Sequence, residues 1–337
     1  MDNLRSFFKR IFSNESTKSS QLPTLKIAML GPTAVGKTSL LAAMYDQFEN
    51  ISRDLEIKPH EATKPILERR LERLKNSVEE DTIKVGKGLP PDTSRRSFMF
   101  DFGEIGAPPA LSLEFQDYPG EFITKGDRQD LETVKSLIQS SVAIIIPIDT
   151  VALMERDGQH HEYFNQTQKV YDLCKYFYED LQSPKLIIFA PIKCESYIHD
   201  PKRLRYRVEE GYARLFNKLS NDKLLTKIAV VITPVQTVGS AYFSRIQYED
   251  GMPILRFRKK DSNDKYKPKY SEQPLRYLFR FLINLHMKQK QEKRWNLPRI
   301  SLFNRDSSLK DAIKEFAYTT SISDVSIVVQ GSNLLEL

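Results

Sequence analysis

Residues 25–48 read LKIAMLGPTAVGKTSLLAAMYDQF, in which an apolar run, a turn with two glycines and an amphipathic segment follow one another. The run LKIAML (25–30) predicts a short strand, because it is apolar and leads directly into glycine. The segment TSLLAAMYDQF (38–48) has apolar side chains at helical spacing and predicts a helix. Between them, GPTAVGKT (31–38) matches the pattern GxxxxGK[ST] in its proper strand–turn–helix context.

Three later segments are continuous apolar runs rich in β-branched residues, which is typical of strands buried on both faces. The three runs are SVAIIIPIDT (141–150), KLIIFAPIK (185–193) and KIAVVITPV (227–235). The segments expected to be helical lie near 129–140, 162–181 and 201–219. This alternation predicts an α/β fold with a doubly wound, mostly parallel sheet.

Other segments predict the surroundings of that sheet. RSFMFDFGE (96–104) and ALSLEFQDY (110–118) predict an antiparallel pair. Residues 59–79 have the pattern of a charged surface helix, inside an insert at about 51–92 that we expect to be helical. Residues 240–270 predict a hairpin or a long loop, and PLRYLFRFLINLHM (274–287) predicts an amphipathic helix that covers the sheet.

The chain divides into three parts in this interpretation. Residues 1–22 form a basic amphipathic helix and a linker, residues 23–290 form the main domain, and residues 291–337 form a C-terminal extension. Within the extension, we expect a helix at 309–318 and either a strand or a docking tail at 323–330. The N-terminal helix either packs on its own domain or binds a partner or a membrane surface.

The composition excludes several classes of protein. The chain has 337 residues, 40% of them hydrophobic, with 51 Lys and Arg against 44 Asp and Glu. Apolar runs such as KLIIFAPI are far shorter than the ~20 residues of a membrane-spanning helix. Cys174 and Cys194 lie outside any CxxC pair, which fits a reducing, cytoplasmic location without disulfides. The aromatic residues have core spacing, so no nucleic-acid partner is expected.

The GPTAVGKT turn has the chemistry of a phosphate-binding loop. Glycines at both ends let the main chain wrap an anion, and the amides and the helix N-terminus then face the phosphates. The Lys37 ammonium reaches the β- and γ-phosphates, and the Thr38 hydroxyl binds Mg²⁺. We assign phosphate binding to Gly31, Ala34, Val35, Gly36, Lys37, Thr38 and Ser39.

A second motif, DYPGE (117–121), follows the apolar run that ends at Phe115. Asp117 is the expected second holder of Mg²⁺, because a carboxylate at a strand end beside the phosphate loop commonly has that role. Gly120 completes the pattern DxxG, in which the glycine amide contacts the γ-phosphate. Glu121 either positions the attacking water weakly, as a catalytic residue, or is a solvated carboxylate.

A loop hydroxyl is also needed to sense the γ-phosphate through Mg²⁺. In LPPDTSRRSF (89–98) we assign this catalytic and metal-binding role to Thr93, the alternative being a turn threonine. Arg95 and Arg96 either stabilise transition-state charge or are surface residues. The adjacent His160 and His161 lie in a polar stretch with no third metal ligand evident, and we expect them to be solvated.

The base of a nucleotide would meet the ends of the next two strands. Guanine presents two donors to a carboxylate, and Glu195 accepts them in this interpretation, while the stem of Lys193 covers the ring. Ile192 lacks the polar group expected at the first position of such a motif. The segment VITPVQTVGS (231–240) is placed for a second base-side loop, and residues Thr233 to Thr237 offer main-chain groups.

The order GPTAVGKT, Thr93, DYPGE, IKCE (192–195) and TPVQTVG (233–239) resembles a Ras-like GTPase domain of the TRAFAC class. DYPGE, TPVQTVG and the helix PLRYLFRFLI are more narrowly similar to the double-GTPase family associated with bacterial conflict and anti-phage gene clusters. The resemblance covers about residues 24–287. It implies a P-loop GTPase, with GTP as substrate and Mg²⁺ as cofactor, that works beside a second GTPase-like or effector protein.

By motif position, the resemblance gives Lys37 and Thr38 the phosphate and metal roles, and gives Asp117 and Gly120 the switch role. We therefore expect a slow GTPase switch in the cytoplasm or at a membrane surface reached through residues 1–12. Two alternatives stay open. One is an ATP-using P-loop enzyme, and the other is a scaffold that binds nucleotide without catalysis.

Overall fold

The computed structural model describes residues 22–77, 82–85, 96–117, 128–178, 181, 183–291, 307–318 and 325–336. The helix predicted within residues 1–22 lies outside these ranges. In the described part of the chain, no helix is both long enough and apolar enough to cross a membrane.

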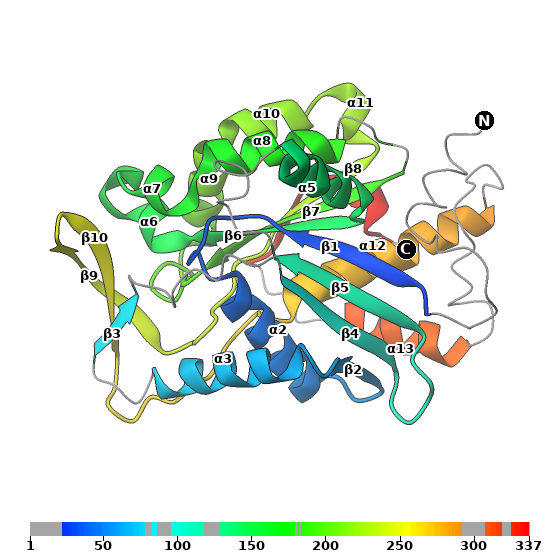
Figure 1. Ribbon diagram of the computed structural model, residues 1–337, viewed down its shortest axis with the longest axis horizontal. Coiled ribbons are helices and arrows are strands. Elements are labelled where there is room, and N and C mark those ends of the chain that lie inside the picture. Colours follow the sequence, from blue (N-terminus) through cyan, green and yellow to red (C-terminus); the bar gives the residue numbers. More distant parts are fainter. Residues whose placement is uncertain are drawn as a thin grey trace.

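In the described residues, the central sheet has eight strands in the order β11-β8-β7-β6-β1-β5-β4-β2 (Figure 1). The inner strands from β8 to β5 are parallel to one another, and the antiparallel strands lie at the two ends. Their bounds are β1 Thr24–Met29, β2 Leu55–Pro59, β4 Arg96–Glu104, β5 Leu111–Asp117, β6 Ala143–Asp149, β7 Lys185–Ile192, β8 Ile228–Ile232 and β11 Ile327–Gln330. This arrangement confirms the predicted doubly wound, mostly parallel sheet.

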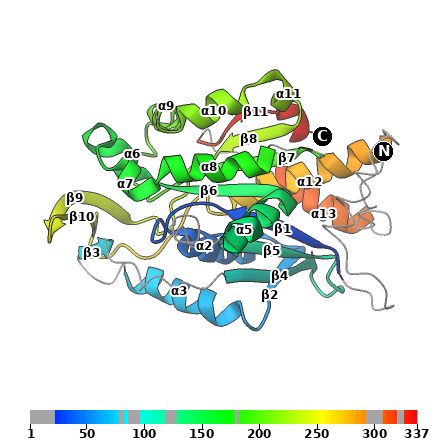
Figure 2. The ribbon, with the colours of Figure 1, turned by 45° about the horizontal axis from the view of Figure 1, so that its top comes forward.

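Helices cover both faces of the sheet (Figures 1 and 2). One face packs against α2 (Lys37–Ile51), α3 (Lys64–Asn76), α12 (Gln273–Gln291) and α13 (Ser307–Tyr318). The other packs against α5 (Arg128–Ser140), α8 (Thr167–Tyr178), α9 (Pro201–Gly211) and α10 (Ala213–Leu219). The short elements are α6 Thr150–Met154, the 3-10 turn Glu155–Gly158, α7 His161–Asn165, α11 Asp222–Leu225 and the 3-10 turn Ser332–Leu334.

The strand sequences explain this two-sided burial. In β7, Leu186 and Ile188 enter the core beneath α2 and α12, whereas Ile187 and Phe189 enter the core beneath α8 and α10. Successive side chains of a strand point to opposite faces, so a strand covered on both sides must be apolar throughout. The continuous apolar runs of the sequence are therefore the inner strands of the sheet.

A second, smaller sheet projects from the side of the molecule in Figure 1. It consists of β3 (Thr82–Val85), β10 (Met252–Lys259) and β9 (Ala241–Glu249), paired antiparallel in that order. Asp250 and Gly251 join β9 to β10, and both have positive φ angles, of 51° and 75°. Two such residues make the tight turn that suits the strand twist, so the predicted hairpin is confirmed.

The insert at about 51–92 differs from the helical one that we expected. It contains α3, but it also contains the strands β2 and β3. Leu55 and Ile57 of β2 are 3% and 4% exposed, and β2 pairs with β4 at the edge of the central sheet. A strand of five residues has too few alternating apolar and polar positions to be recognised from sequence. Its pairing partner lies about forty residues away along the chain.

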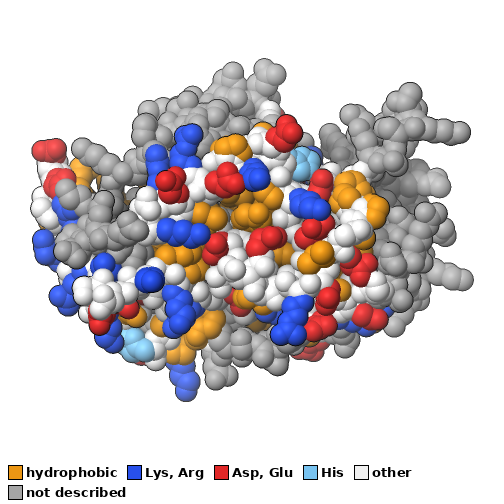
Figure 3. Space-filling view, turned by 90° about the horizontal axis from the view of Figure 1, so that it is seen from below, with side chains coloured by type: hydrophobic (Ala, Val, Ile, Leu, Met, Phe, Trp, Pro, Cys, Tyr) orange, Lys and Arg blue, Asp and Glu red, His pale blue; other side chains and the backbone are white. Residues whose placement is uncertain are grey.

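The outer face of α3 is solvated, as its charge pattern predicts. Seen from below, this surface has Lys and Arg side chains interspersed with Asp and Glu (Figure 3). Leu67 is the buried anchor of the helix, and Ile66 and Leu71 pack beside it. Exposed residues of α3 include Lys64, Glu68, Arg69, Glu72 and Arg73.

The described parts of the C-terminal extension pack into the same core as the sheet. Arg280 of α12 donates from Nε to the carbonyl of Ala317 at 2.8 Å, and Arg276 donates to the carbonyl of Phe316. These guanidinium groups satisfy main-chain carbonyls at the end of α13, where a helix has no internal donors left. β11 then pairs antiparallel with β8 at the edge of the central sheet.

Replacing Phe316 tests this shared core. The ring is 6% exposed, and its centroid lies 4.8 Å from that of Phe48 in α2. We expect Phe316→Ala to lower the free energy of unfolding by about 3–5 kcal/mol, because it leaves a cavity between α13 and α2. Urea unfolding followed by circular dichroism measures this loss.

The matched control is Tyr206→Ala, since Tyr206 is 62% exposed and its removal is expected to change little. The loss in Phe316→Ala is expected in a single transition. A separate early transition, with the main transition unmoved, would show that α13 is not part of the main core.

Candidate nucleotide site

The GPTAVGKT loop joins β1 to α2 at the carboxyl edge of the parallel strands. Ala34 and Gly36 have positive φ angles of 68° and 119°, so the main chain curls as an anion-binding loop requires. Ligands of open α/β sheets bind at this edge, outside the ends of the strands. The predicted loop is therefore placed where it could hold a phosphate group.

Lys37 is the first residue of α2, and its side chain is buried under the loop. Its ammonium donates to the carbonyls of Gly31 at 2.7 Å and Pro32 at 2.9 Å. The same Nζ lies 3.3 Å from Oδ1 of Asp117. Asp117 ends β5, which is parallel to β1, and pairs in register with Met29 just before the loop. The structure thus brings together the predicted phosphate lysine and the predicted metal carboxylate.

The donor set suits a magnesium ion. Thr38 and Ser39 lie in the first turn of α2, and both are partly exposed. Mg²⁺ prefers oxygen ligands and usually takes one or two protein groups together with phosphate oxygens and water. The Thr38 hydroxyl and the Asp117 carboxylate are groups of that kind on neighbouring elements, so both assignments fit the metal.

Ile192 packs directly on the phosphate loop. A Cβ atom added to Gly36 would lie 2.5 Å from Cδ1 of Ile192, which is closer than such atoms approach in proteins. Glycine is favoured here mainly by its φ angle, and a larger residue would also have to displace the end of the Ile192 side chain. Ile192 departs from the polar residue of the base motif, and here it is an apolar support for the loop.

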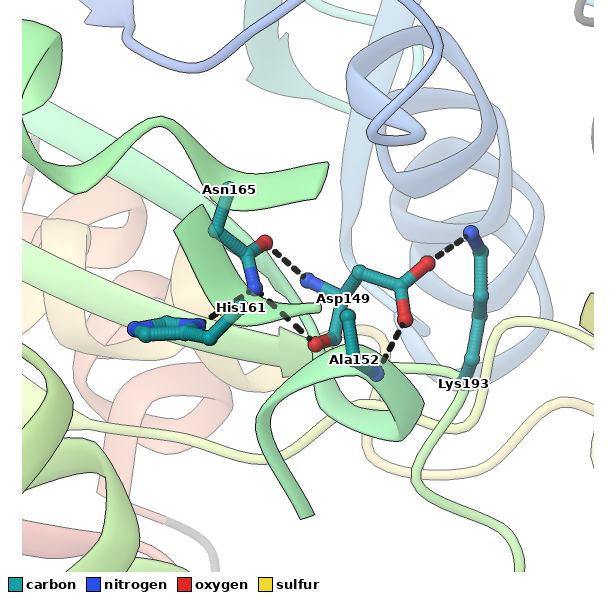
Figure 4. A network of polar contacts seen from close by, with 5 residues as sticks. All are labelled: Asp149, Ala152, His161, Asn165 and Lys193. Carbon is teal, nitrogen blue, oxygen red and sulfur yellow. Dashed lines mark hydrogen bonds and ion pairs between the residues drawn. The ribbon is translucent and has the colours of Figure 1, made fainter. Parts of the chain in front are cut away.

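Lys193 has an ionic partner that the sequence analysis missed. It stands just past β7 with a φ of 57°, and its ammonium forms an ion pair with the carboxylate of Asp149 (Figure 4). Asp149 ends β6 and is 1% exposed. Its other oxygen accepts from the amide of Ala152 at 3.0 Å and caps α6. Asp149 therefore fixes the head of the Lys193 side chain.

Asn165 and His161 hold Asp149 from the opposite side (Figure 4). Asn165 Oδ1 accepts from the amide of Asp149 at 2.7 Å, and Nδ2 donates to its carbonyl at 3.1 Å. Asn165 Nδ2 also donates to Nδ1 of His161 at 2.8 Å. An accepting Nδ1 leaves the proton on Nε2, which faces the carbonyl of Gly211 at 3.4 Å.

The two histidines do not lie in an open solvated loop, contrary to our expectation, since His160 is buried and His161 is half-buried. Burial lowers the pKa of His161, because the charged form loses its hydration. His160 is 8% exposed, and Tyr248 of β9 lies 3.1 Å from its Nε2. The stretch RDGQHHEY looks polar in sequence, but it is folded between β6 and the hairpin, so local composition did not reveal its burial.

Glu195 is turned toward the loop at 236–239. The residue is 4% exposed, and its Oε1 accepts from the amides of Gly239 at 3.0 Å and Val238 at 3.3 Å. Oε2 is buried and has no partner in the described part of the chain. Burial raises the pKa of this carboxyl, while the two amides and Lys193 oppose that rise.

The remaining base-side residues also lie close to this loop. Residues 233–237 are buried, and the Thr233 hydroxyl accepts from Ser326 Oγ at 3.0 Å. Both elements predicted to meet a base are thus neighbours in space. Three predicted residues, Thr93, Gly120 and Glu121, lie outside the described residues, as does Arg95.

Comparisons with known proteins find likeness only among solved structures. No family model and no curated protein matches the chain. The GTPase-like domain of Ski7 from S. cerevisiae, bound to GTP, is 15% identical, with a TM-score of 0.36 over 63% of this chain and 42% of the Ski7 chain. The same domain bound to GDP and inorganic phosphate gives 15%, a TM-score of 0.37, and 69% and 45%.

A third structure is the SRb-GTP/SRX complex of the signal recognition particle receptor from Chaetomium thermophilum. It is 15% identical, with a TM-score of 0.39 over 66% of this chain and 93% of that chain. The chain spans less than half of the Ski7 chains that it matches. TM-scores this low do not indicate a function, so a functional assignment has to come from the geometry of the chain itself.

His161 gives the site a measurable pH dependence. Its pKa in the folded chain is below its ordinary value of about 6.5, so below that pH the unfolded chain binds more protons. The stability from His161 is therefore fully present above about pH 6.5 and is lost as the pH falls below it. We expect His161→Gln to flatten the slope of unfolding free energy between about pH 5 and 7.

Urea unfolding at closely spaced pH values measures this slope. Glutamine keeps an acceptor for Asn165, so the hydrogen-bonded chain to Asp149 is retained while the titrating group is removed. Equal slopes in the wild-type and variant proteins would contradict the neutral, buried state of His161.

Proposed function

We propose that the protein is a Mg²⁺-dependent GTPase switch that binds the triphosphate in the loop Gly31–Thr38. The observation that supports this most directly is the position of the Lys37 ammonium, 2.7 and 2.9 Å from two loop carbonyls and 3.3 Å from Asp117. An ammonium held beside a curled loop and the start of a helix is well placed to bind anionic oxygens. The β- and γ-phosphates supply such oxygens.

Phosphate binding follows from the residues of the loop. Main-chain amides from residues 34 to 39 and the start of α2 donate to phosphate oxygens, which the helix dipole also favours. Lys37 neutralises charge that develops between the β- and γ-phosphates as the bond to the leaving group breaks. Fixed donors of this kind stabilise the transition state without reorganisation.

The metal would be held by Thr38 and Asp117. When bound, Mg²⁺ neutralises charge on the β- and γ-phosphate oxygens. Asp117 would supply a carboxylate oxygen to the ion, and the Lys37 ammonium, 3.3 Å from that carboxylate, would bind the phosphates. We further assign Thr93 to the metal, and Gly120 and Glu121 to the γ-phosphate and the attacking water.

Guanine is the base that Glu195 favours. Among the described residues, Oε2 is buried without a hydrogen-bond partner, and Oε1 already accepts from two amides. A buried carboxylate oxygen is stabilised by an N–H donor, and guanine offers two at N1 and at its exocyclic amine. Adenine presents an acceptor at N1 instead, so the same oxygen disfavours ATP.

The cellular role is the finer part of this proposal. The similarity of DYPGE and TPVQTVG to the double-GTPase family supports a slow switch that acts with a second GTPase-like or effector protein in a bacterial defence system. We expect the protein to act in the cytoplasm, with residues 1–12 available for a membrane surface or for that partner.

Removing the Lys37 ammonium tests phosphate binding. We expect Lys37→Ala to weaken GTP binding by at least about tenfold, the loss of one charge-assisted hydrogen bond, and to reduce turnover to background. Titration with a fluorescent GTP analogue and release of inorganic phosphate measure the two effects. Lys64→Ala is the control, since its side chain is 62% exposed on α3. Undiminished turnover in Lys37→Ala would refute the assignment.

Replacing one carboxylate oxygen of Glu195 by an amide group tests base recognition. In Glu195→Gln, Oε1 still accepts from Val238 and Gly239, but an amide group replaces Oε2. That group donates, so it opposes guanine and suits the C2 carbonyl of xanthine. We expect the preference for GTP over XTP to fall at least about tenfold, measured by competition against the fluorescent analogue.

An unchanged ratio of GTP to XTP affinity in Glu195→Gln would place this residue away from the base. Tight nucleotide binding without turnover in the wild-type protein would favour the scaffold alternative. Equal competition by ATP and GTP would favour the ATP-using enzyme.

A further inference from the structure

The loop at 236–239 is bonded along its length to a second segment, residues 266–269, which we call the strap. Gln236 and Lys269 exchange main-chain hydrogen bonds of 3.0 Å in both directions. The amide of Lys267 donates to the carbonyl of Val238 at 2.9 Å. The strap lies in the chain between β10 and α12, and it runs beside the loop as a short antiparallel partner.

Gly239 is the tightest point of this contact. It has a φ of 82°, and a Cβ atom added to it would lie 1.7 Å from the carbonyl oxygen of Lys267 and 2.4 Å from its carbonyl carbon. Both atoms belong to the main chain, so a rotating side chain could not relieve the overlap. Any residue larger than glycine at this position must move either the loop or the strap.

The same glycine bonds to Glu195. Its amide donates to Oε1 at 3.0 Å, and this is the shorter of the two hydrogen bonds that orient the carboxylate. Gly239 is therefore held by the strap and in turn holds Glu195. A displacement of the strap would be transmitted to the carboxylate through Gly239 and its neighbour Val238, whose amides both donate to Oε1.

The strap also has a contact outside the loop, through Tyr266. The ammonium of Lys75, at the end of α3, lies 5.8 Å from the centre of the Tyr266 ring and 3.8 Å from Asp46 of α2. Through Lys75, the strap therefore also contacts α3 and α2, outside the loop at 236–239.

We propose that the strap is a positioning element for base selectivity, with Gly239 as the positioning residue through which it acts. The strap sets the loop, the loop turns Oε1 of Glu195 inward, and Oε2 is left for the donor edge of a purine. This inference depends on the proposed GTP binding. It adds that selectivity between guanine and adenine is determined by a segment that follows the β9–β10 hairpin.

Gly239→Ala tests the inference in the full-length protein. We expect the ratio of GTP affinity to ATP affinity to fall at least about tenfold, the loss of a hydrogen bond to a charged group. GTP and ATP share their triphosphate and ribose, so this ratio isolates the base, whereas general destabilisation lowers both affinities alike. Competition of each nucleotide against a fluorescent triphosphate measures it.

Gly251→Ala is the matched control. Gly251 also has a positive φ, of 75°, but no atom of the described residues lies within 4 Å of a Cβ atom added there. The variant therefore has the same backbone strain without the contact, and the wild-type ratio is expected. A ratio that falls equally in both variants would overturn the inference.

Lys267→Pro is the second variant, and it tests the role of the strap if Gly239→Ala does not fold. Proline has no amide hydrogen, so this change removes the 2.9 Å bond to Val238. We expect a reduced ratio with a fold unchanged by circular dichroism. If Gly239→Ala or Lys267→Pro folds and keeps the wild-type ratio of GTP to ATP affinity, the inference is wrong but the proposed function stands. If the wild-type protein binds neither nucleotide, both are wrong.

Discussion

The ammonium of Lys37 lies where two loop carbonyls, a carboxylate and the start of a helix converge, and the site is arranged about that point. A buried charge of this kind is stable only when its partners are fixed. The register of β1 against β5 fixes Asp117, and the contact of Ile192 with Gly36 fixes the loop. The packing of the sheet and the electrostatics of the site therefore depend on one another.

The sequence predicted those parts of the molecule whose signals are local. The GPTAVGKT turn has a fixed spacing, and the inner strands are continuous apolar runs, so the fold and the position of this turn between a strand and a helix could be predicted directly. Asp117 followed from its place at a strand end. The strands β2 and β3 were not predicted, because short strands are stabilised mainly by pairing with strands that are distant in the sequence.

The contacts of Lys193 and Glu195 could not be predicted for the same reason, because their partners lie far along the chain. The ion pair of Lys193 with Asp149 joins residues 44 positions apart, and the bond of Glu195 to Gly239 also spans 44. One signal was available, since Asp149 ends an apolar run at the carboxyl edge of the sheet. Asn165 and His161 had no such signal in the sequence, because only the folded chain brings α7 next to Asp149.

The edges of the central sheet have a consequence for the whole chain. Its outermost strands, β2 and β11, have five and four residues, whereas their inner neighbours include the fully apolar IAVVI of β8. Exposed apolar strands recruit other chains, so short outer strands act as covers. A chain cut before Ile327 would present β8 as a bare edge, and self-association into aggregates would then compete with folding.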